Sequence, residues 1–333
     1  MGRVRLGTVI GAAVLALLVG GCAQAPPPLT YPSSPPLPTG SSLPGPGPGT
    51  GSPSATAAKY SKVLVIAEEN HSYGEIIGDP AAPYVTMLAN TYGTATNMNA
   101  GYPTGCPSLA AYILLTSGST QGICDDDNPS AHQLSASSIF SQVDDAGMQW
   151  RNYAEDAPDN CASTNADNDR FLVRHTPAPY YTSEAVRCAS WDVPLGTVTS
   201  GALHDDVVLG TLPAYSFVTP DACGDMHGAP ACPGGDVSIG DAWLRSWIPV
   251  IMGGPDYTAG RLVIIITWDE GNSSSNHIPT VVISPTTRGV SSGTAFTHCS
   301  TLRATEEILG LGTLGCAANA PSMLGPFHLG TGR

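Results

Sequence analysis

Two runs of aliphatic and β-branched residues most constrain how this chain folds. Residues 62–67 read KVLVIA and residues 261–268 read RLVIIITW, and neither run alternates apolar with polar positions. A strand of this kind is buried on both faces, which is typical of the centre of a parallel sheet that helices cover. The two runs therefore predict an α/β fold with a mainly parallel central sheet.

The segments around these runs alternate between strand and helix patterns, as in a sheet whose crossovers are helical. Further strands are expected at 149–153, 214–219 and 279–284, and helices at 83–91, 107–116, 137–146, 241–252 and 299–309. Residues 156–210 are rich in Asn, Asp and Pro, so we expect loops or a cap over the site there. Residues 59–333 are enough for one large domain with a well-buried core.

The start of the chain has the pattern of a bacterial lipoprotein signal, at residues 1–22. Arg3 and Arg5 precede an apolar run that is shorter than the roughly 20 residues needed to span a membrane. The run ends in LVGGC, which resembles a lipobox, so we expect Cys22 to carry lipid. The alternative is an ordinary export signal with an incidental cysteine. We expect an exported protein that this anchor alone holds at the membrane or cell surface.

Residues 23–58 consist largely of Pro, Gly, Ser and Thr. Such a stretch cannot bury enough apolar surface to offset its ordering entropy, so we expect a disordered tether. The whole chain has a formal net charge of −14 and only 13 Lys and Arg residues. Affinity for the phosphate backbone comes from cationic side chains, so nucleic acid is excluded as a partner.

Eight cysteines remain once Cys22 is set aside for lipid. In an oxidising compartment an even number favours disulfides, here four. Eight cysteines allow 105 pairings, so a preference for short loops is all that selects neighbours in sequence. That preference gives Cys106–Cys124, Cys161–Cys188, Cys223–Cys232 and Cys299–Cys316. A zinc site is disfavoured, because no C-x2-C pair occurs.

Acidic residues follow both apolar runs directly. Glu69 and Asn70 come after the first run, and Asp269 and Glu270 come after the second. Ligands of open parallel sheets bind at the carboxyl ends of strands, so the two pairs meet if the strands are neighbours. Oxygen ligands of this kind suit Mg, Ca, Mn or a similar divalent ion. The alternative is that these are solvated loop carboxylates.

Histidines form a second set of candidates. Asp225 and His227 form a D-x-H pair, which can ligate a metal or serve phosphate binding and proton transfer. His175 precedes Thr-Pro, and His277 follows the Ser/Asn-rich loop after the second acidic pair. A lone histidine is more often structural, so this spacing alone is a weak signal.

Ser108 follows a proline and opens an apolar helix pattern. A hydroxyl in the first helical turn lies where backbone N–H groups and the helix dipole favour anions, which suits phosphate. The alternative is an ordinary helix cap, and the pattern alone favours it. The chain has no G-x-S-x-G elbow, no P-loop and no H-E-x-x-H motif.

Six motifs in order resemble the bacterial phosphoesterase family that holds secreted acid phosphatases and phospholipases C. They are VLVIAEENHSYGEIIG at 63–78, PSLAAYILLTSG at 107–118, YSFVTPDACGDMH at 215–227, GDAWL at 240–244, TWDE at 267–270 and HIPTVVISP at 277–285. The resemblance covers nearly everything from residue 60 to residue 321. It implies an alkaline-phosphatase-like α/β sandwich with helices on both faces of the sheet.

The resemblance also implies roles for the candidate residues. Ser108 would be the nucleophile, and the other candidates would bind metal or lie around the phosphate as ligands, oxyanion stabilisers or proton donors. Those others are Glu69, Asn70, Asp269, Glu270, Asp225, His175, His227 and His277. The chain departs from the family at Cys106, where relatives have His, at Ala110–Ala111 for Pro-Asn, at Asp221 for Asn and at Gly228 for an acidic residue.

These observations lead to one functional expectation with two rivals. We expect a metal-assisted phosphomonoesterase of the acid phosphatase type, monomeric, acting on a phosphorylated small molecule or a lipid headgroup such as a phosphoinositide. The first rival is a phosphodiesterase of the phospholipase C type. The second is a surface lipoprotein whose decayed site only binds a phosphorylated ligand.

Overall fold

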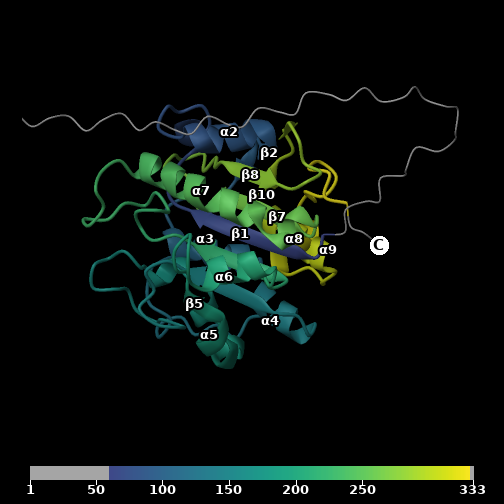
Figure 1. Cartoon of the computed structure of the whole chain (residues 1–333). Coiled ribbons are helices and arrows are strands. Elements are labelled where there is room, and N and C mark those ends of the chain that lie inside the picture. The colour runs from purple at the N-terminus through teal and green to yellow at the C-terminus, as the bar shows by residue number, and fades with distance from the viewer. Residues whose placement is uncertain (1–59, 331–333) are drawn as a thin grey trace, which may run out of the picture. The chain divides into compact units, whose positions relative to one another are not determined.

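A computed structural model of the chain describes residues 60–330 (Figure 1). The predicted signal, Cys22 and the tether at 23–58 lie outside the described residues. The main sheet has eight strands in the order β5-β4-β6-β1-β7-β8-β2-β9. The bounds of these strands are Lys62–Glu68 (β1), Gly93–Ala95 (β2), Trp150–Ala154 (β4), Asp192–Pro194 (β5), Tyr215–Thr219 (β6), Leu262–Trp268 (β7), Thr280–Ile283 (β8) and Val290–Ser292 (β9). Met98–Asn99 (β3) and Phe296–Thr297 (β10) form a second, two-stranded sheet.

The two apolar runs become the centre of the main sheet, as the sequence predicts. β1 pairs in parallel with β7 on one side and with β6 on the other, with Val63 opposite Val263 and Tyr215. All seven residues of β7 are buried. Only β8 runs against its neighbours β7 and β2, so the prediction of a mainly parallel sheet is confirmed.

Helices cover both faces of this sheet. The longer helices are Pro83–Thr91 (α2), Ser108–Ser117 (α3), Ile139–Asp145 (α4), Ala185–Trp191 (α5), Ala202–Leu209 (α6), Asp236–Gly253 (α7) and His298–Leu309 (α9). Figure 1 views the face on which α6, α7 and the short α8 (Pro255–Thr258) lie against one another. On the other face α3 packs against α9, which also contacts β1. No helix within residues 60–330 is long and apolar enough to cross a membrane.

The elements expected from the sequence are present, with two differences. α7 begins at Asp236 rather than Asp241. The expectation of loops over residues 156–210 is only partly right, because α5, β5 and α6 lie there. β5 is a three-residue strand at the edge of the sheet, too short to show a periodic pattern. All four expected disulfides are confirmed.

Candidate active site

The acidic residues meet because β1 and β7 are neighbours in register. Glu68 lies opposite Trp268, so Glu69 and Asp269 leave the sheet side by side. The backbone N–H of Asn70 donates to Asp269 Oδ1 at 3.1 Å. Asn70 has a φ of +54°, in the left-handed region that Asn tolerates better than most residues. The structure therefore brings together the strand-end residues that the sequence singled out.

Ser108 is the first residue of α3, and its side chain is directed at this cluster. Its hydroxyl donates to Glu69 Oε2 at 2.9 Å, and the residue is only 4% exposed. One turn later the Tyr112 hydroxyl donates to Glu69 Oε1 at 2.6 Å. The disulfide Cys106–Cys124 closes the loop just before Ser108. The hydroxyl thus makes a side-chain contact that an ordinary helix cap does not need.

His175 lies between two buried carboxyl groups. Its Nε2 is 3.3 Å from Glu69 Oε1, and its Nδ1 is 3.0 Å from Asp225 Oδ2. The ring also stacks on Tyr112, with centroids 5.2 Å apart. The other oxygen of Asp225 accepts the backbone N–H of His227 at 2.8 Å. Both oxygens of Asp225 are therefore engaged with histidines.

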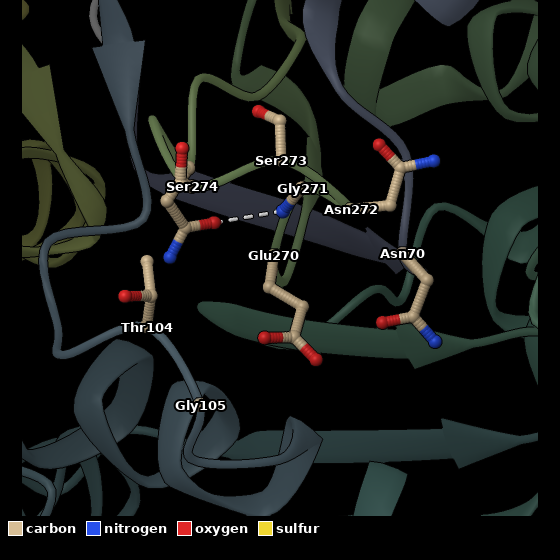
Figure 2. Close-up of a pocket in the computed structure, with 9 residues that line it drawn as sticks. Asn70, Thr104, Gly105, Glu270, Gly271, Asn272, Ser273 and Ser274 are labelled. Carbon is tan, nitrogen blue, oxygen red and sulfur yellow. Dashed lines mark hydrogen bonds between the residues drawn. The ribbon is translucent and has the colours of Figure 1, made fainter.

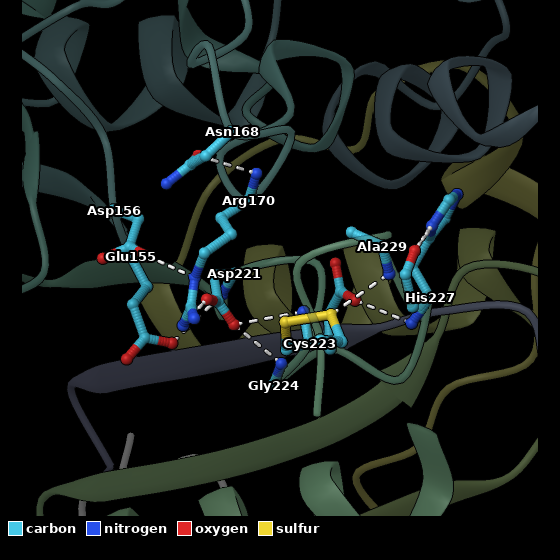
Figure 3. The surroundings of a disulfide bond; sticks show 12 residues. Glu155, Asp156, Asn168, Arg170, Asp221, Cys223, Gly224, His227 and Ala229 are labelled. Carbon is cyan, nitrogen blue, oxygen red and sulfur yellow. Dashed lines mark hydrogen bonds and ion pairs between the residues drawn. A yellow bond between two sulfur atoms is a disulfide. The ribbon is translucent and has the colours of Figure 1, made fainter. Parts of the chain in front are cut away.

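A disulfide and a short turn shape the loop that follows β6 (Figure 3). Asp221 Oδ1 accepts the backbone N–H groups of Cys223 at 3.1 Å and Gly224 at 2.8 Å. Cys223 is joined to Cys232. This closed loop brings Asp225 toward β1, where its carbonyl accepts the Glu69 N–H at 2.7 Å.

Burial controls the ionisation of the cluster. It raises the pKa of Glu69 well above its usual range, and the neighbouring carboxyls of Asp269 and Asp225 raise it further. Burial likewise raises the pKa of Asp269 to about 8 and lowers that of His175. Each shift disfavours the charged form. Carboxyl groups crowded in this way favour the protonated form, and a bound cation would favour the charged form instead.

The residues present fit such a cation. Asp269 Oδ2 is buried and accepts no hydrogen bond from the described part of the chain. Oxygen donors from carboxylates and an amide suit a hard divalent ion. Glu69, Asp269, Glu270 and Asn70 supply such atoms from two neighbouring strand ends. One ligand atom from each of Glu69, His175 and His227 also lies within 4.8 Å of the others.

Glu270 and Asn70 line an open polar cavity of about 440 Å³ beside the buried cluster. Figure 2 shows the Glu270 carboxyl and the Asn70 amide extending to the same side. Glu270 Oε2 accepts the Tyr102 hydroxyl at 2.7 Å. The remaining lining residues are Thr104, Gly105, Gly271, Asn272, Ser273, Ser274 and Asn276. Solvent and small polar ligands therefore reach one side of the site.

His277 is placed differently from the other candidates. Its Nε2 donates to the Thr96 carbonyl at 3.1 Å, and its ring stacks on Tyr73 with centroids 4.9 Å apart. Within residues 60–330 none of its side-chain hydrogen bonds reaches Glu69 or Ser108. The structure therefore does not join His277 to the cluster.

Three residues at the site carried no signal strong enough to be chosen from the sequence. Tyr112 bonds Glu69, Arg174 contacts His227, and Asp126 pairs with Arg174. Only their positions hinted at them: Tyr112 lies one turn after Ser108, and Arg174 directly precedes His175.

Known proteins with similar sequences are phosphatases. The pattern of the Phosphoesterase family matches residues 80–312. The chain is 28% identical over 263 residues to a phosphatidylinositol-3-phosphatase from Mycobacterium tuberculosis, which covers 79% of this chain and 81% of that protein. It is 26% identical over 228 residues to an acid phosphatase from Aspergillus fumigatus, which covers 64% of this chain and 48% of that protein.

Solved structures share the fold at low sequence identity. A protein of the alkaline phosphatase superfamily from Vibrio parahaemolyticus superposes with a TM-score of 0.54 at 13% identity, covering 80% of this chain and 72% of that one. The lipoteichoic acid synthase LtaP from Listeria monocytogenes gives 0.51 at 11% identity, covering 80% and 77%. The expected alkaline-phosphatase-like sandwich is thereby confirmed. Because the family pattern spans most of its length, this chain belongs to the Phosphoesterase family and is a hydrolase that acts on phosphoric ester bonds.

Proposed function

We propose that this protein is an exported, metal-assisted phosphomonoesterase whose nucleophile is Ser108. The observation that carries the proposal is the 2.9 Å hydrogen bond from the Ser108 hydroxyl to Glu69 Oε2. It holds the oxygen at the N-terminus of the ten-residue helix α3, where backbone N–H groups favour a phosphate anion. A serine that only capped the helix would bond to the backbone instead.

The carboxylates around Ser108 support a divalent cation as cofactor. Glu69, Asp269 and Glu270, with the amide of Asn70, would hold it. Such an ion supplies positive charge that lowers the pKa of the serine hydroxyl and offsets charge on the phosphoryl oxygens. In this proposal Asp225 orients His175 rather than binding metal, because both of its oxygens are already engaged.

The reaction then proceeds in two displacements. Ser108 Oγ forms a bond to phosphorus as its proton leaves along the hydrogen bond to Glu69 Oε2, and the bond to the leaving oxygen breaks. The leaving group departs as an alcohol once it gains a proton. His175 contacts Glu69 at 3.3 Å and is placed to pass that proton on. Water next attacks the phosphoserine, which restores the hydroxyl and releases inorganic phosphate.

Export and substrate class rest on different observations. Four disulfides within residues 60–330 support an oxidising compartment. The lipid anchor at Cys22 stays a prediction from the sequence. The similarity to a phosphatidylinositol-3-phosphatase and to an acid phosphatase supports a phosphorylated headgroup or small molecule as substrate, with monoesters preferred over diesters.

The decisive experiment compares wild type with Ser108→Ala on aryl phosphate mono- and diesters, with and without chelator. We expect faster release from the monoester, loss of turnover on chelation, and loss of turnover in Ser108→Ala. Ser246→Ala is the matched control, because that hydroxyl lies on the exposed surface of α7 and bonds only the Ala242 carbonyl. Undiminished turnover by Ser108→Ala contradicts the proposal, and faster release from the diester favours the phosphodiesterase.

A further inference from the structure

One guanidinium group contacts the acidic site. The group belongs to Arg174, whose side chain contacts the candidate site residue His227. Its backbone is fixed next to His175, in a short 3-10 helix formed by Val173–His175. The side chain is only 17% exposed. The guanidinium charge therefore lies next to the site residue His227 and is largely shielded from solvent.

The contacts of Arg174 define the state of His227. Arg174 Nη2 lies 3.1 Å from His227 Nε2, and His227 Nδ1 lies 2.7 Å from the Gly228 carbonyl oxygen. A guanidinium only donates and a carbonyl only accepts, so the proton of the neutral ring is on Nδ1 and Nε2 accepts. Burial lowers the pKa of His227, and the charge of Arg174 lowers it further. Arg174 thus occupies the lone pair of a neutral His227.

Asp126 connects this guanidinium to the nucleophile helix. Asp126 Oδ2 is 3.2 Å from Arg174 Nε, and Asp126 Oδ1 accepts the backbone N–H of Leu109 at 3.1 Å. Leu109 is the residue after Ser108. Two residues before Asp126, Cys124 is bonded to Cys106, two residues before Ser108. One carboxylate and one disulfide therefore set where Arg174 lies relative to the Ser108 turn.

The arrangement leaves the guanidinium with donors to spare. Of its five N–H groups, only one makes a hydrogen bond within residues 60–330, the contact with His227, and the pairing of Nε with Asp126 is an ion pair without a hydrogen bond. Arg174 and His227 also line a cavity of about 230 Å³, with Leu172 and Pro230 among its walls. A phosphate dianion at Ser108 is repelled by the charged carboxylates of Glu69 and Asp269, and a guanidinium bound to its oxygens would offset that repulsion. A planar guanidinium matches two phosphate oxygens at once.

We propose that Arg174 binds the phosphoryl oxygens of the substrate at Ser108, with Asp126 as the residue that positions it. Substrate oxygens replace His227 as the partner of Nη2, which leaves His227 Nε2 free to contact the phosphoryl or leaving group. This inference rests on the proposed function, since it takes Ser108 as the point of attack.

The test compares Arg174→Gln and Arg174→Lys with the wild type on an aryl phosphate. We expect Arg174→Gln to lower kcat/KM by about 10²–10³-fold, the cost of losing one preorganised donor to negative charge, and Arg174→Lys to recover part of the loss. The inhibition constant of inorganic phosphate should rise at least about tenfold in Arg174→Gln, because the variant lacks one charge-assisted contact to the phosphate. Arg187→Gln is the control, because Arg187 pairs with Asp144 on the surface. Phosphate inhibition of Arg174→Gln equal to that of wild type overturns the inference.

A second measurement does not depend on turnover. Inorganic phosphate is titrated calorimetrically into Ser108→Ala and into Ser108→Ala/Arg174→Gln, with thermal unfolding as the check on folding. We expect binding to the first and clearly weaker binding to the second. Equal affinities, or no binding to Ser108→Ala, overturn the role of Arg174. Turnover that survives Ser108→Ala instead overturns the proposed function, so the two failures are distinguishable.

The positioning role of Asp126 has its own readout. Asp126→Asn keeps an acceptor for the Leu109 N–H but removes the charge that holds Arg174. We expect weaker phosphate inhibition and a raised KM with an unchanged unfolding midpoint, and Asp126→Glu should restore part of both. A variant that loses stability while keeping wild-type phosphate inhibition shows a structural role only and contradicts the proposal.

Discussion

Glu68 and Glu69 are neighbours in the chain, yet their side chains lie on opposite faces of the sheet. Both are fully buried, and burial raises the pKa of each well above its usual range. Glu69 accepts hydrogen bonds from the Ser108 and Tyr112 hydroxyls on the α3 face. Neither oxygen of Glu68 has a hydrogen-bond partner in the described part of the chain. The two carboxyls thus differ in their partners and not in their burial.

The carboxyls near Glu68 hold backbone and indole groups in place. On the α7 face, Asp241 Oδ1 accepts the N–H groups of Tyr84 and Val85 at the start of α2. Glu155 Oε2 accepts Trp243 Nε1 at 2.7 Å. The donors on this face are N–H groups that a fold must satisfy, whereas on the α3 face they are a serine, a tyrosine and a histidine. A raised pKa therefore does not distinguish the two faces, whereas the chemistry of the hydrogen-bond donors does.

The largest expected effect separates these neighbours directly. Glu69→Gln should lower kcat/KM for an aryl phosphate by about 10³-fold, because it removes the carboxylate that orients the Ser108 hydroxyl. Glu68→Gln should leave kcat/KM essentially unchanged, since a protonated acid and an amide are similar in shape. Steady-state kinetics on both variants is the measurement. Equal losses would break the distinction between the faces.

A divalent cation should stabilise the protein through the α3 face only. At 100 times its Kd, a bound ion raises the free energy of unfolding by about 2.7 kcal/mol. We expect Mg²⁺ or Mn²⁺ to raise the unfolding midpoint of the wild type and of Glu155→Gln, but not of Asp269→Asn. Thermal unfolding with and without cation tests this. A shift that persists in Asp269→Asn removes Asp269 from the cation site.

The α7 face should show its role in stability. Asp241→Ala leaves the N–H groups of Tyr84 and Val85 without their acceptor, which should cost about 1–3 kcal/mol in the free energy of unfolding. Asp241→Asn keeps an acceptor and should lose less. Urea denaturation measures both variants. If Asp241→Ala instead loses turnover while its unfolding curve is unchanged, the face is not merely structural.

The last expected effect is a pH dependence of the free energy of unfolding. Burial raises the pKa of Glu155 from 4.5 to about 7, so the folded state holds a proton that the unfolded chain releases above about pH 4.5. Stability contributed by this group is therefore lost as pH rises from about 4.5 to about 7. Glu155→Gln should flatten that decline by up to about 1.4 kcal/mol per pH unit. Unfolding measured across this range checks it, and an identical slope in the variant refutes the assignment.

The centre of the fold was predictable because its signal is local. The two apolar runs and the acidic residues after them fixed where strands end, and parallel register then placed Glu69 beside Asp269. Ser108 is a different case, since its pattern alone favours a helix cap and only the family resemblance implies a nucleophile. The structure adds the bond to Glu69, which no spacing in the sequence encodes.

Other side-chain placements depend on contacts between distant loops. Arg174 meets Asp126 only because a 3-10 turn and a disulfide-closed loop converge on the start of α3. His277 looked equivalent to the other histidines, but its bond to the Thr96 carbonyl depends on how two loops pack. Side-chain contacts of this kind depend on the tertiary structure, which residue patterns do not predict.

The disulfide Cys106–Cys124 has a consequence for when the enzyme becomes competent. It ties together the segment before Ser108 and the segment that carries Asp126. Where thiols stay reduced, as in a cytosol, this disulfide does not form and the Ser108 turn is not tied to the segment that carries Asp126. A chain that matures only after leaving the cell interior would not hydrolyse the phosphate esters of the cell that makes it. Disulfide formation would then limit the activity of the hydrolase to the outside of the cell.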